Sequence, residues 1–520
     1  MARYTTLYLS ALIAGLTAAL FGYSVGFIGG IIVLPSFLSH FSLSTLPPSA
    51  LASTQAQIIT SWLVGALFGV PLGMPFCSRF GRKGCLFLAG GLYVCGAGMQ
   101  LLDFGIGGFK VGRALNGLGV GVGTLGGPMY ISEISPPSER GMLMSSYQTI
   151  LQLSALAGFW GAFLSHSSFP SSSSLQWRLP TAIQLIPGIL LLLGACSIPE
   201  TPSFLAGKGR EREAERSLVS LRGVRGEEWM VEGEMQEIRD AARVSSLVRD
   251  KNVPFSKELL KPGIRKRLVV GVGLMIAQNM VGLNALNYYA PVIFMSAGFT
   301  SVSSSLFLTG VFGVVKLLSA IAFMFVFVKI RGNRFWLPLG SSLCGVCMLF
   351  LAYFVHKIPP ANQLGAVPHW LGEAKLTLGG VVSVLTVYIF AFSFSVSLGP
   401  ISWNVCSEIF PLHINAKCCV MTTCTQWLFQ IVIAYITPQL LTTIGWGTYL
   451  IYVLFCLLTT LFVFFSVPET RNVPLGREMD SLFDDKKDID EEEEMEEESE
   501  TTLLLKHGQR ERRGSLGVYT

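Results

Sequence analysis

Side-chain amides recur inside segments of this chain that are otherwise apolar. They are Gln148, Gln278, Asn279, Asn284, Asn287, Gln426 and Gln430, with Trp403 and Trp427 nearby. An amide offers two hydrogen-bond donors and an acceptor, which suits the hydroxyl groups of a polyol, while an indole face can cover the C–H side of a sugar ring. Polar groups in mid-membrane are costly and usually mark a solute pathway, so these residues predict a site for a polyhydroxylated solute. For each single amide the alternative is a hydrogen bond between helices.

Two cations, Arg113 and Lys316, lie in the same kind of segment. A charge there costs at least ~2.5–3.5 kcal/mol unless it is paired or hydrated. No acidic residue is predicted in mid-membrane, because Asp103, Glu133 and Glu408 fall near the ends of apolar segments. We therefore expect both cations to face a central cavity, where they would suit a polyhydroxylated carboxylate. A neutral hexose would leave Lys316 needing another partner, such as a backbone carbonyl, and both kinds of solute stay open.

The composition of the chain shows that these amides and cations lie in a largely apolar protein. Of the 520 residues, 51% are hydrophobic and only 14% are charged, whereas a soluble protein carries about 25% charged residues. Residues 199–267 hold 27 of the Lys, Arg, Asp and Glu, and residues 468–520 hold another 24. This pattern excludes a soluble enzyme, a disordered protein and a basic surface for nucleic acid, and it indicates a polytopic membrane protein.

Runs of roughly 20 apolar residues are long enough to cross a bilayer core. Twelve occur, at 7–34, 58–76, 84–102, 111–131, 142–164, 180–198, 267–297, 305–328, 334–355, 376–401, 416–440 and 446–467. We therefore predict an all-α membrane protein built from two six-helix bundles. Its parts are an N-terminal bundle at 1–198, a linker with short helices at 199–266, a C-terminal bundle at 267–467 and a largely disordered acidic tail at 468–520.

Lys and Arg in the short loops set the expected orientation, with eight on one side of the membrane and four on the other. The positive-inside rule then places the linker and both termini in the cytosol. We expect a multi-pass protein of the plasma membrane. The tail also contains Glu500-x3-Leu504-Leu505, a short acidic dileucine pattern that predicts contact with a sorting adaptor.

Short motifs repeat between the two halves of the chain. The sequence Ser132-Glu133-Ile134-Ser135-Pro136 has a counterpart in Ser407-Glu408-Ile409-Phe410-Pro411, and Pro199-Glu200-Thr201 recurs as Pro468-Glu469-Thr470. Such repeats, in the same order, indicate two bundles related by an axis along the membrane normal, with a solute site between them.

We expect gates at both ends of the solute pathway. On the cytosolic side, carboxylates can pair with basic side chains across the two bundles; the candidates are Glu133, Glu408, Arg82, Arg140 and Arg334. The alternative is that these residues only anchor helix ends at lipid headgroups. On the outer side we expect Tyr288 and Tyr289 to form the gate, because the run 267–297 must break near Gly282 and Pro291 to move.

Longer motifs follow one another in a fixed order. They are Gly15-x5-Phe21-Gly22-Tyr23, Pro128-Met129-Tyr130-x2-Glu133, Trp177-Arg178-x-Pro180-x3-Gln184, Pro199-Glu200-Thr201-Pro202, Gly282-x-Asn284-x3-Tyr288-Tyr289 and Gly399-Pro400-x2-Trp403. Together they resemble the sugar-porter family of the major facilitator superfamily over roughly residues 7–483, most of all its fungal quinate-permease and hexose-transporter branch. The resemblance implies the major facilitator fold with short cytosolic helices, and it implies solute contact for Gln148, Gln278, Asn284 and Trp403.

The chain departs from the family's pattern at several of these positions. Asn279 stands where sugar-binding relatives usually have Gln, Gln426 where Asn is usual, and Lys316 where many relatives have Asn. Ser24 occupies the position at which proton-coupled relatives carry the Asp that partners Arg113. Without that carboxylate, facilitated diffusion is favoured, and proton symport is the alternative.

A non-transporting nutrient sensor is a further alternative, although a tail as short as residues 468–520 argues for transport. The sequence contains no H-E-x-x-H, no P-loop and no paired carboxylates within an apolar run, so we do not expect an enzyme, a metal site or a cofactor. The expected partners are a small polyol or hydroxy acid and the lipid bilayer, without nucleic acid.

Overall fold

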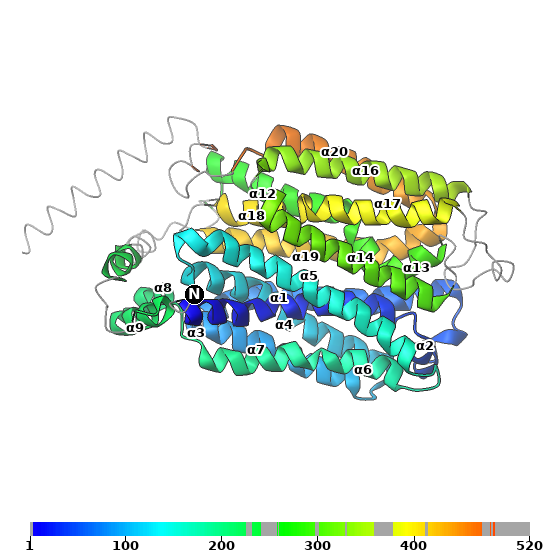
Figure 1. The fold of residues 1–520 in the computed structure, drawn as a ribbon, viewed down its shortest axis with the longest axis horizontal. Coiled ribbons are helices and arrows are strands. Elements are labelled where there is room, and N and C mark those ends of the chain that lie inside the picture. Colours follow the sequence, from blue (N-terminus) through cyan, green and yellow to red (C-terminus); the bar gives the residue numbers. More distant parts are fainter. Residues whose placement is uncertain are drawn as a thin grey trace, which may run out of the picture.

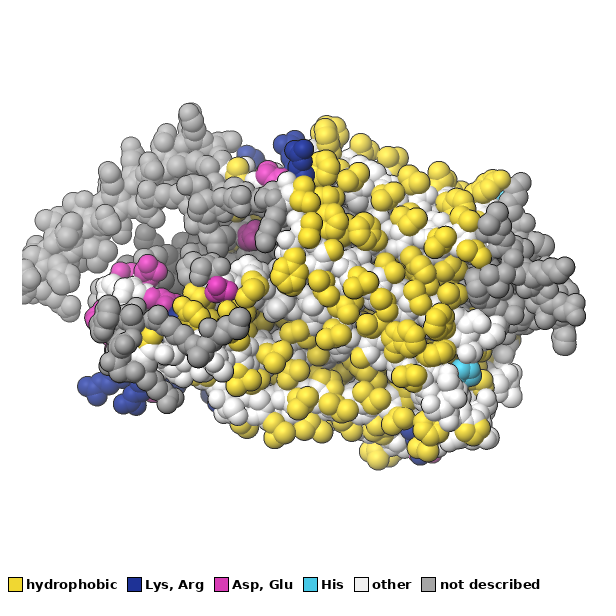
Figure 2. Space-filling view, in the orientation of Figure 1, with side chains coloured by type: hydrophobic (Ala, Val, Ile, Leu, Met, Phe, Trp, Pro, Cys, Tyr) yellow, Lys and Arg dark blue, Asp and Glu magenta, His cyan; other side chains and the backbone are white. Residues whose placement is uncertain are grey.

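The computed structural model describes residues 4–224, 231–240, 257, 259–296, 301–327, 330–357, 378–410, 414–470, 479 and 482–483. Within these ranges the chain forms helices and no strand. Most of the long helices run side by side along one axis (Figure 1), and apolar side chains cover the flank of the bundle (Figure 2). The acidic tail from residue 484 onward and its Glu500-x3-Leu504-Leu505 pattern lie outside the described residues.

The first half of the chain contributes four long helices and several short ones. They are α1 (Thr5–Ile31), α2 (Pro35–His40), η2 (Leu43–Thr45), α3 (Pro48–Leu101), α4 (Gly105–Ile134), α5 (Pro137–Ser168), α6 (Leu175–Ile183) and α7 (Leu185–Ser197). The main contacts in this half are those of α3 with α4 and of α1 with α5.

Two short helices follow, α8 (Pro202–Gly207) and α9 (Glu211–Arg222), at one end of the molecule (Figure 1). We call this the linker end, and the opposite end, where α2 lies, the far end. The apolar faces of the linker helices pack into a small core of their own, formed by Phe204, Leu205, Ala214, Leu218, Val219, Val224, Val231 and Met235. Short helices between the two halves agree with the arrangement expected of the linker.

The second half contains α12 (Pro262–Met280), α13 (Leu283–Ser296), α14 (Val302–Ala322), the π-helical turn η4 (Phe323–Phe327), α16 (Asn333–Lys357), α17 (Leu378–Ser395), α18 (Leu398–Glu408), α19 (Asn415–Thr443) and α20 (Gly447–Ser466). The halves meet through α3 with α19, α5 with α14, and α1 with α13. Each contact joins segments that are far apart in the sequence.

Every predicted apolar run overlaps a helix, and the predicted all-α class is confirmed for the described residues. Nine helical segments of the described part of the chain are long and apolar enough to cross a membrane. The longest of them, the 54-residue α3, contains the run 58–76 and all but the last residue of the run 84–102. The runs 111–131 and 142–164 correspond to α4 and α5, which are not among these nine segments. Helix α4 is rich in glycine, and α5 is rich in polar residues.

Two predicted spans are broken helices. The predicted break near Gly282 is confirmed, since α12 ends at Met280, α13 begins at Leu283, and Gly282 adopts φ +98°. The break predicted near Pro291 is wrong, because α13 continues through this proline to Ser296.

The break at Ser397 was not predicted. Its backbone is non-helical (φ −134°, ψ −97°), and it precedes Pro400 of α18 by three residues. A proline has no N–H to donate to the carbonyl four residues earlier, which weakens the helix at that point. At Gln184, three residues before Pro187, α6 joins α7 with α-helical backbone angles (φ −54°, ψ −31°), so this span is not broken.

The two spans inside α3 are separated at Gly81, whose φ of +86° is left-handed. The carboxylate of Glu200 reaches this turn and accepts hydrogen bonds from the backbone N–H groups of Arg82 at 3.1 Å and Lys83 at 3.2 Å. The second half of the chain repeats the arrangement, with Glu469 accepting from the backbone N–H groups of Asn333 and Arg334 at 2.9 and 3.1 Å. The repeated Pro-Glu-Thr motif therefore supplies a carboxylate cap for a helix start in each half.

We predict that Gly81→Ala destabilises the protein. A Cβ at this position would lie 2.1 Å from Glu200 Oε2, and a left-handed backbone costs roughly 1–2 kcal/mol for any residue with a Cβ. The melting temperature in detergent should fall clearly. Gly98→Ala, in the same helix, is the matched control because a Cβ there would meet no atom within 4 Å. Equal melting temperatures for the two variants would contradict this account of the turn.

Candidate functional site

A cavity of about 120 Å³ lies between the two halves. Helices α1, α4 and α5 line it from the first half, while α14, η4 and α18 line it from the second. Two predicted site residues line it from opposite halves, Gln148 on α5 and Trp403 on α18. Asn404 and Ser407 on α18 also line it, although the sequence did not single them out. Their signal was available, since both are polar residues on the helix that carries Trp403.

The predicted amides of α12, α13 and α19 form a separate, buried network. Gln426 Oε1 accepts hydrogen bonds from Gln278 Nε2 at 2.6 Å and from Asn279 Nδ2 at 2.5 Å. Asn279 Oδ1 in turn accepts from Asn284 Nδ2 at 2.6 Å. These four side chains bond one another, and none of them lines the cavity beside Trp403. The predicted site is thus divided into two neighbouring parts in this conformation.

Gln430 and Tyr288 extend the network toward the far end. Gln430 Nε2 donates to the Tyr288 hydroxyl at 2.7 Å and lies 3.4 Å from Asn284 Oδ1. Tyr289 donates its hydroxyl to the backbone carbonyl of Ala434 on α19 at 2.9 Å. Both tyrosines named as gate residues therefore tie α13 to α19.

The two halves touch directly at the far end. A Cβ on Gly29 of α1 would lie 2.7 Å from the carbonyl oxygen of Tyr288, so the backbones of α1 and α13 are in contact. Nearer the middle, the rings of Phe21, Trp62 and Trp427 pack together with centroids 5.1, 5.6 and 5.9 Å apart. Since Phe21 also lines the cavity, this cluster connects the cavity with the packed interface between the halves.

The two predicted cations are both buried, and neither lines the cavity. Lys316 Nζ donates to Asn287 Oδ1 at 2.9 Å and lies 5.5 Å from the centre of the Phe312 ring. A side-chain amide, rather than the backbone carbonyl considered above, therefore satisfies Lys316. Arg113 has no hydrogen-bond acceptor among the described residues.

Ser24, at the position of the absent carboxylate, belongs to a neutral network. Its hydroxyl lies 3.0 Å from the Tyr93 hydroxyl and donates to Asn116 Oδ1 at 3.2 Å. Asn116 Oδ1 also accepts from the indole N–H of Trp62 at 3.0 Å. Asn116 was missed by the sequence reading, although its polar side chain within the apolar run 111–131 was a usable signal.

At the linker end, Arg82 and Glu133 form an ion pair. Glu133 Oε1 accepts from Arg82 Nε at 2.9 Å and Nη2 at 2.6 Å, and Glu133 Oε2 accepts from the Thr201 hydroxyl at 2.6 Å. Arg82 lies on α3 and Glu133 on α4, so this pair lies within the first half. We expected Arg82 and Glu133 to pair with side chains of the other bundle, but in this structure they pair with each other. The reason is that the Gly81 turn places Arg82 beside the end of α4.

The other predicted gate residues make weaker contacts. Arg140 Nη2 lies 3.5 Å from the backbone carbonyl of Ser135, and Arg334 Nη2 lies 3.5 Å from that of Phe464. Among the described residues, Glu408 forms no ion pair with Arg82, Arg140 or Arg334. In this conformation no charged pair of the predicted set joins the two halves.

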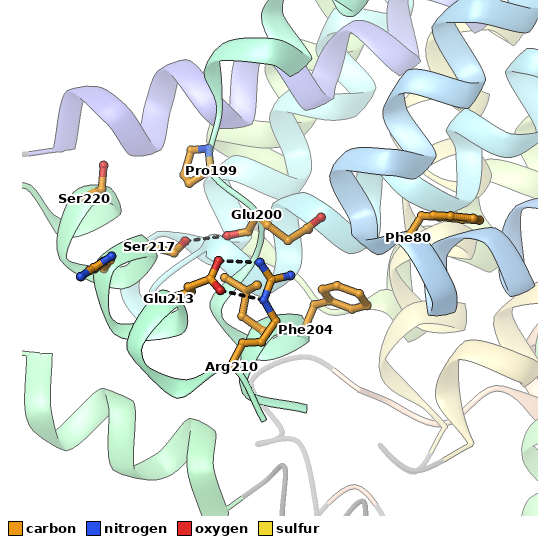
Figure 3. Close-up of a pocket in the computed structure, with 10 residues that line it drawn as sticks. Phe80, Pro199, Glu200, Phe204, Arg210, Glu213, Ser217 and Ser220 are labelled. Carbon is orange, nitrogen blue, oxygen red and sulfur yellow. Dashed lines mark hydrogen bonds and ion pairs between the residues drawn. The ribbon is translucent and has the colours of Figure 1, made fainter. Parts of the chain in front are cut away.

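A pocket of about 410 Å³ lies between the linker helices and the bundle (Figure 3). Glu200 lines it together with Arg210 and Glu213, which form an exposed pair at 2.5 Å between Arg210 Nη2 and Glu213 Oε2. Burial raises the pKa of the Glu200 carboxyl, although backbone N–H groups partly oppose this effect. The Ser217 hydroxyl donates to the Glu200 backbone carbonyl at 2.6 Å. These contacts brace the linker against the bundle and lie away from the amides.

Comparisons with known proteins agree with this architecture. Residues 10–483 match the family model described as "Sugar (and other) transporter". The chain is 33% identical to a probable quinate permease of Aspergillus fumigatus over 491 residues, 92% of this chain and 88% of that protein. It is 32% identical to the quinate permease of Neurospora africana over 483 residues, with the same coverage.

Solved structures of the xylose transporter XylE are also similar. The partially occluded inward-open form from E. coli gives a TM-score of 0.73 at 26% identity, covering 91% of this chain and all of that one. The proton:xylose symporter XylE bound to 6-bromo-6-deoxy-D-glucose gives 0.75 at 26% identity, covering 93% and 100%. The predicted family resemblance and major facilitator fold are confirmed.

We predict that Gln426→Leu lowers stability by about 1–3 kcal/mol, because two buried amide donors lose their shared acceptor. The melting temperature in detergent measures this effect. Gln439→Leu is the matched control, since Gln439 lies exposed on the same helix. If both variants melt at the wild-type temperature, the network around Gln426 does not stabilise this conformation.

Proposed function

The chain belongs to the sugar (and other) transporter family, and we propose that it carries a small polyhydroxylated solute across a membrane by alternating access. The solute is a monosaccharide or a quinate-type hydroxy acid. The observation that carries this proposal is the buried amide network of Gln278, Asn279, Asn284 and Gln426 within the second half, where α13 and α19 contact helices of the first half. The relatives named as quinate permeases and as a xylose transporter support the same solute class.

Solute binding is proposed to exchange one set of hydrogen bonds for another. The amides now satisfy one another, so a hydroxyl group that enters between Gln278 and Gln426 replaces an amide–amide bond rather than breaking it without compensation. Such an exchange keeps the desolvation cost low, since a buried donor or acceptor left unpaired costs about 1–3 kcal/mol. Gln148 and Trp403 at the adjoining cavity supply a further amide and an aromatic face.

Alternating access requires the two halves to move relative to each other. We propose bundles at residues 1–198 and 267–467, joined by the linker at 199–266 and followed by the tail at 468–520, as the moving and connecting parts. The contact of Gly29 with Tyr288 would then open when the far end opens. The linker end, with Arg82, Glu133, Arg140, Arg334 and Glu408, would form the opposite gate and face the cytosol, with the protein in the plasma membrane.

We favour facilitated diffusion over proton symport. Ser24 holds the position of the proton-carrying carboxylate and is engaged in a neutral network with Tyr93 and Asn116. The acidic side chains of the described residues lie at helix ends or in the linker. Symport is the second candidate, because the related XylE is named a proton:xylose symporter. A non-transporting nutrient sensor would show no flux at all.

We predict that proteoliposomes containing the wild-type chain take up labelled quinate or glucose down its gradient, at a rate that a proton uncoupler leaves unchanged. Ser24→Asp restores a carboxylate beside Arg113 and should make uptake sensitive to the uncoupler and raise external pH during uptake. Ser24→Ala is the control, since it removes the hydroxyl without adding a charge. Alkalinisation of the medium by the wild-type chain itself would rule out simple facilitated diffusion.

A further inference from the structure

Arg113 is a fully buried cation whose guanidinium lacks a hydrogen-bond acceptor among the described residues. None of Nε, Nη1 and Nη2 has a partner. The rings of Phe27 and Trp62 lie with their centres 5.6 and 5.4 Å from the central carbon of the guanidinium. Aromatic faces stabilise positive charge, but they do not replace the oxygen acceptors that guanidinium N–H groups require.

Each of the other buried cations of the described chain has at least one hydrogen-bond acceptor. Lys316 donates to Asn287 Oδ1 at 2.9 Å. Arg222 and Arg267 donate through Nη1 to backbone carbonyl oxygens at 2.9 and 3.2 Å. All four cations are buried, but Arg113 differs from the other three because its side chain has no hydrogen-bond acceptor among the described residues.

Neighbouring side chains do not supply the missing counter-charge. Ser24 is committed to Tyr93 and Asn116, and it is neutral. Asp103, the acidic residue closest to Arg113 along the chain, lies exposed and contacts His40 at 3.1 Å and Arg178 at 3.8 Å. A charge in apolar surroundings is expensive unless it is paired, so the counter-charge is best supplied by a ligand.

Tyr288 places a second donor in the same region. Helix α1 joins the two residues, because its Phe27 ring lies against the Arg113 guanidinium of α4 and its Gly29 backbone is in contact with the backbone of Tyr288 on α13. The Tyr288 oxygen accepts from Gln430 Nε2 at 2.7 Å, which leaves the phenolic hydrogen to donate elsewhere. A planar guanidinium beside a phenolic O–H is a donor set that suits a carboxylate, and it also suits a halide.

We propose that Arg113 and Tyr288 form an anion-binding subsite where the amide network ends. Its ligand is the carboxylate of a hydroxy-acid solute or a small inorganic anion that binds beside a neutral solute. The proposal rests on the transport function proposed above and adds the charge of the ligand to it. Arg113 is chosen over Lys316 because Asn287 Oδ1 already gives the Lys316 ammonium group an oxygen acceptor, whereas the Arg113 guanidinium has none among the described residues.

The test compares the full-length chain with Arg113→Gln and with the matched control Lys316→Gln in proteoliposomes. Uptake of labelled quinate and of labelled glucose is measured in chloride and in methanesulfonate. If the ligand is the solute carboxylate, Arg113→Gln should lower quinate uptake at least ~10-fold, the factor that corresponds to one lost charge-assisted hydrogen bond, and leave glucose uptake within about twofold of wild type. Lys316→Gln should retain quinate uptake within about twofold.

An inorganic ligand gives a different result. Wild-type glucose uptake should then fall when methanesulfonate replaces chloride, and Arg113→Gln should lose this dependence. Two results together would overturn the subsite. Arg113→Gln would take up quinate at the wild-type rate, and glucose uptake by the wild-type chain would not depend on chloride.

Binding to the wild-type chain is measured separately, so the proposal stays testable if Arg113→Gln does not fold or no solute is transported. Melting temperatures are compared in quinate, methyl quinate, chloride and methanesulfonate. Stabilisation by quinate but not by its methyl ester, or by chloride but not by methanesulfonate, supports the subsite. Equal melting temperatures in all four would refute it. If no solute is transported but an anion still stabilises the chain, the result contradicts the proposed transport function and leaves the subsite supported.

Discussion

The cost of placing polar and charged groups in apolar surroundings is the constraint on which this structure depends. Most of the charge is confined to residues 199–267 and 468–520, outside the apolar runs. Several of the polar groups that remain inside are held by one another. The amides of α12, α13 and α19 share their donors and acceptors, Ser24 joins Tyr93 and Asn116, and Lys316 is held by Asn287. Arg113 stands apart among the buried cations, which makes it informative about the ligand.

The same constraint explains how the chain interrupts its helices. A helix start inside or beside a membrane exposes backbone N–H groups that need acceptors. Glu200 supplies them after the Gly81 turn, and Glu469 supplies them at the start of α16. The repeat visible in the sequence thus has a physical cause, because both halves solve one capping problem with a carboxylate from a later segment. The break at Gly282 separates α12 from α13, the helix that contacts α1 of the first half.

The division of the predicted site bears on transport. Gln148 and Trp403 line the cavity, whereas the amide network is closed on itself and lies against α13, the helix that meets α1 at the far end. A solute that opens the network would therefore act on a contact between the halves. In the proposed mechanism, this arrangement would link the recognition of hydroxyl groups to the relative movement of the two halves.

Much of this was decided by the sequence itself. Hydropathy and the spacing of charges identified the apolar runs, the glycine at 282 identified one break, and polar residues within apolar runs identified the amides and both cations. These are local properties, which a single segment carries with it. The tertiary structure alone decided which side chains meet. It paired Arg82 with Glu133 inside one half, gave Lys316 an amide partner and left Arg113 without one. Such pairings depend on how helices distant in the sequence pack against each other, and neither hydropathy nor motif spacing encodes that packing.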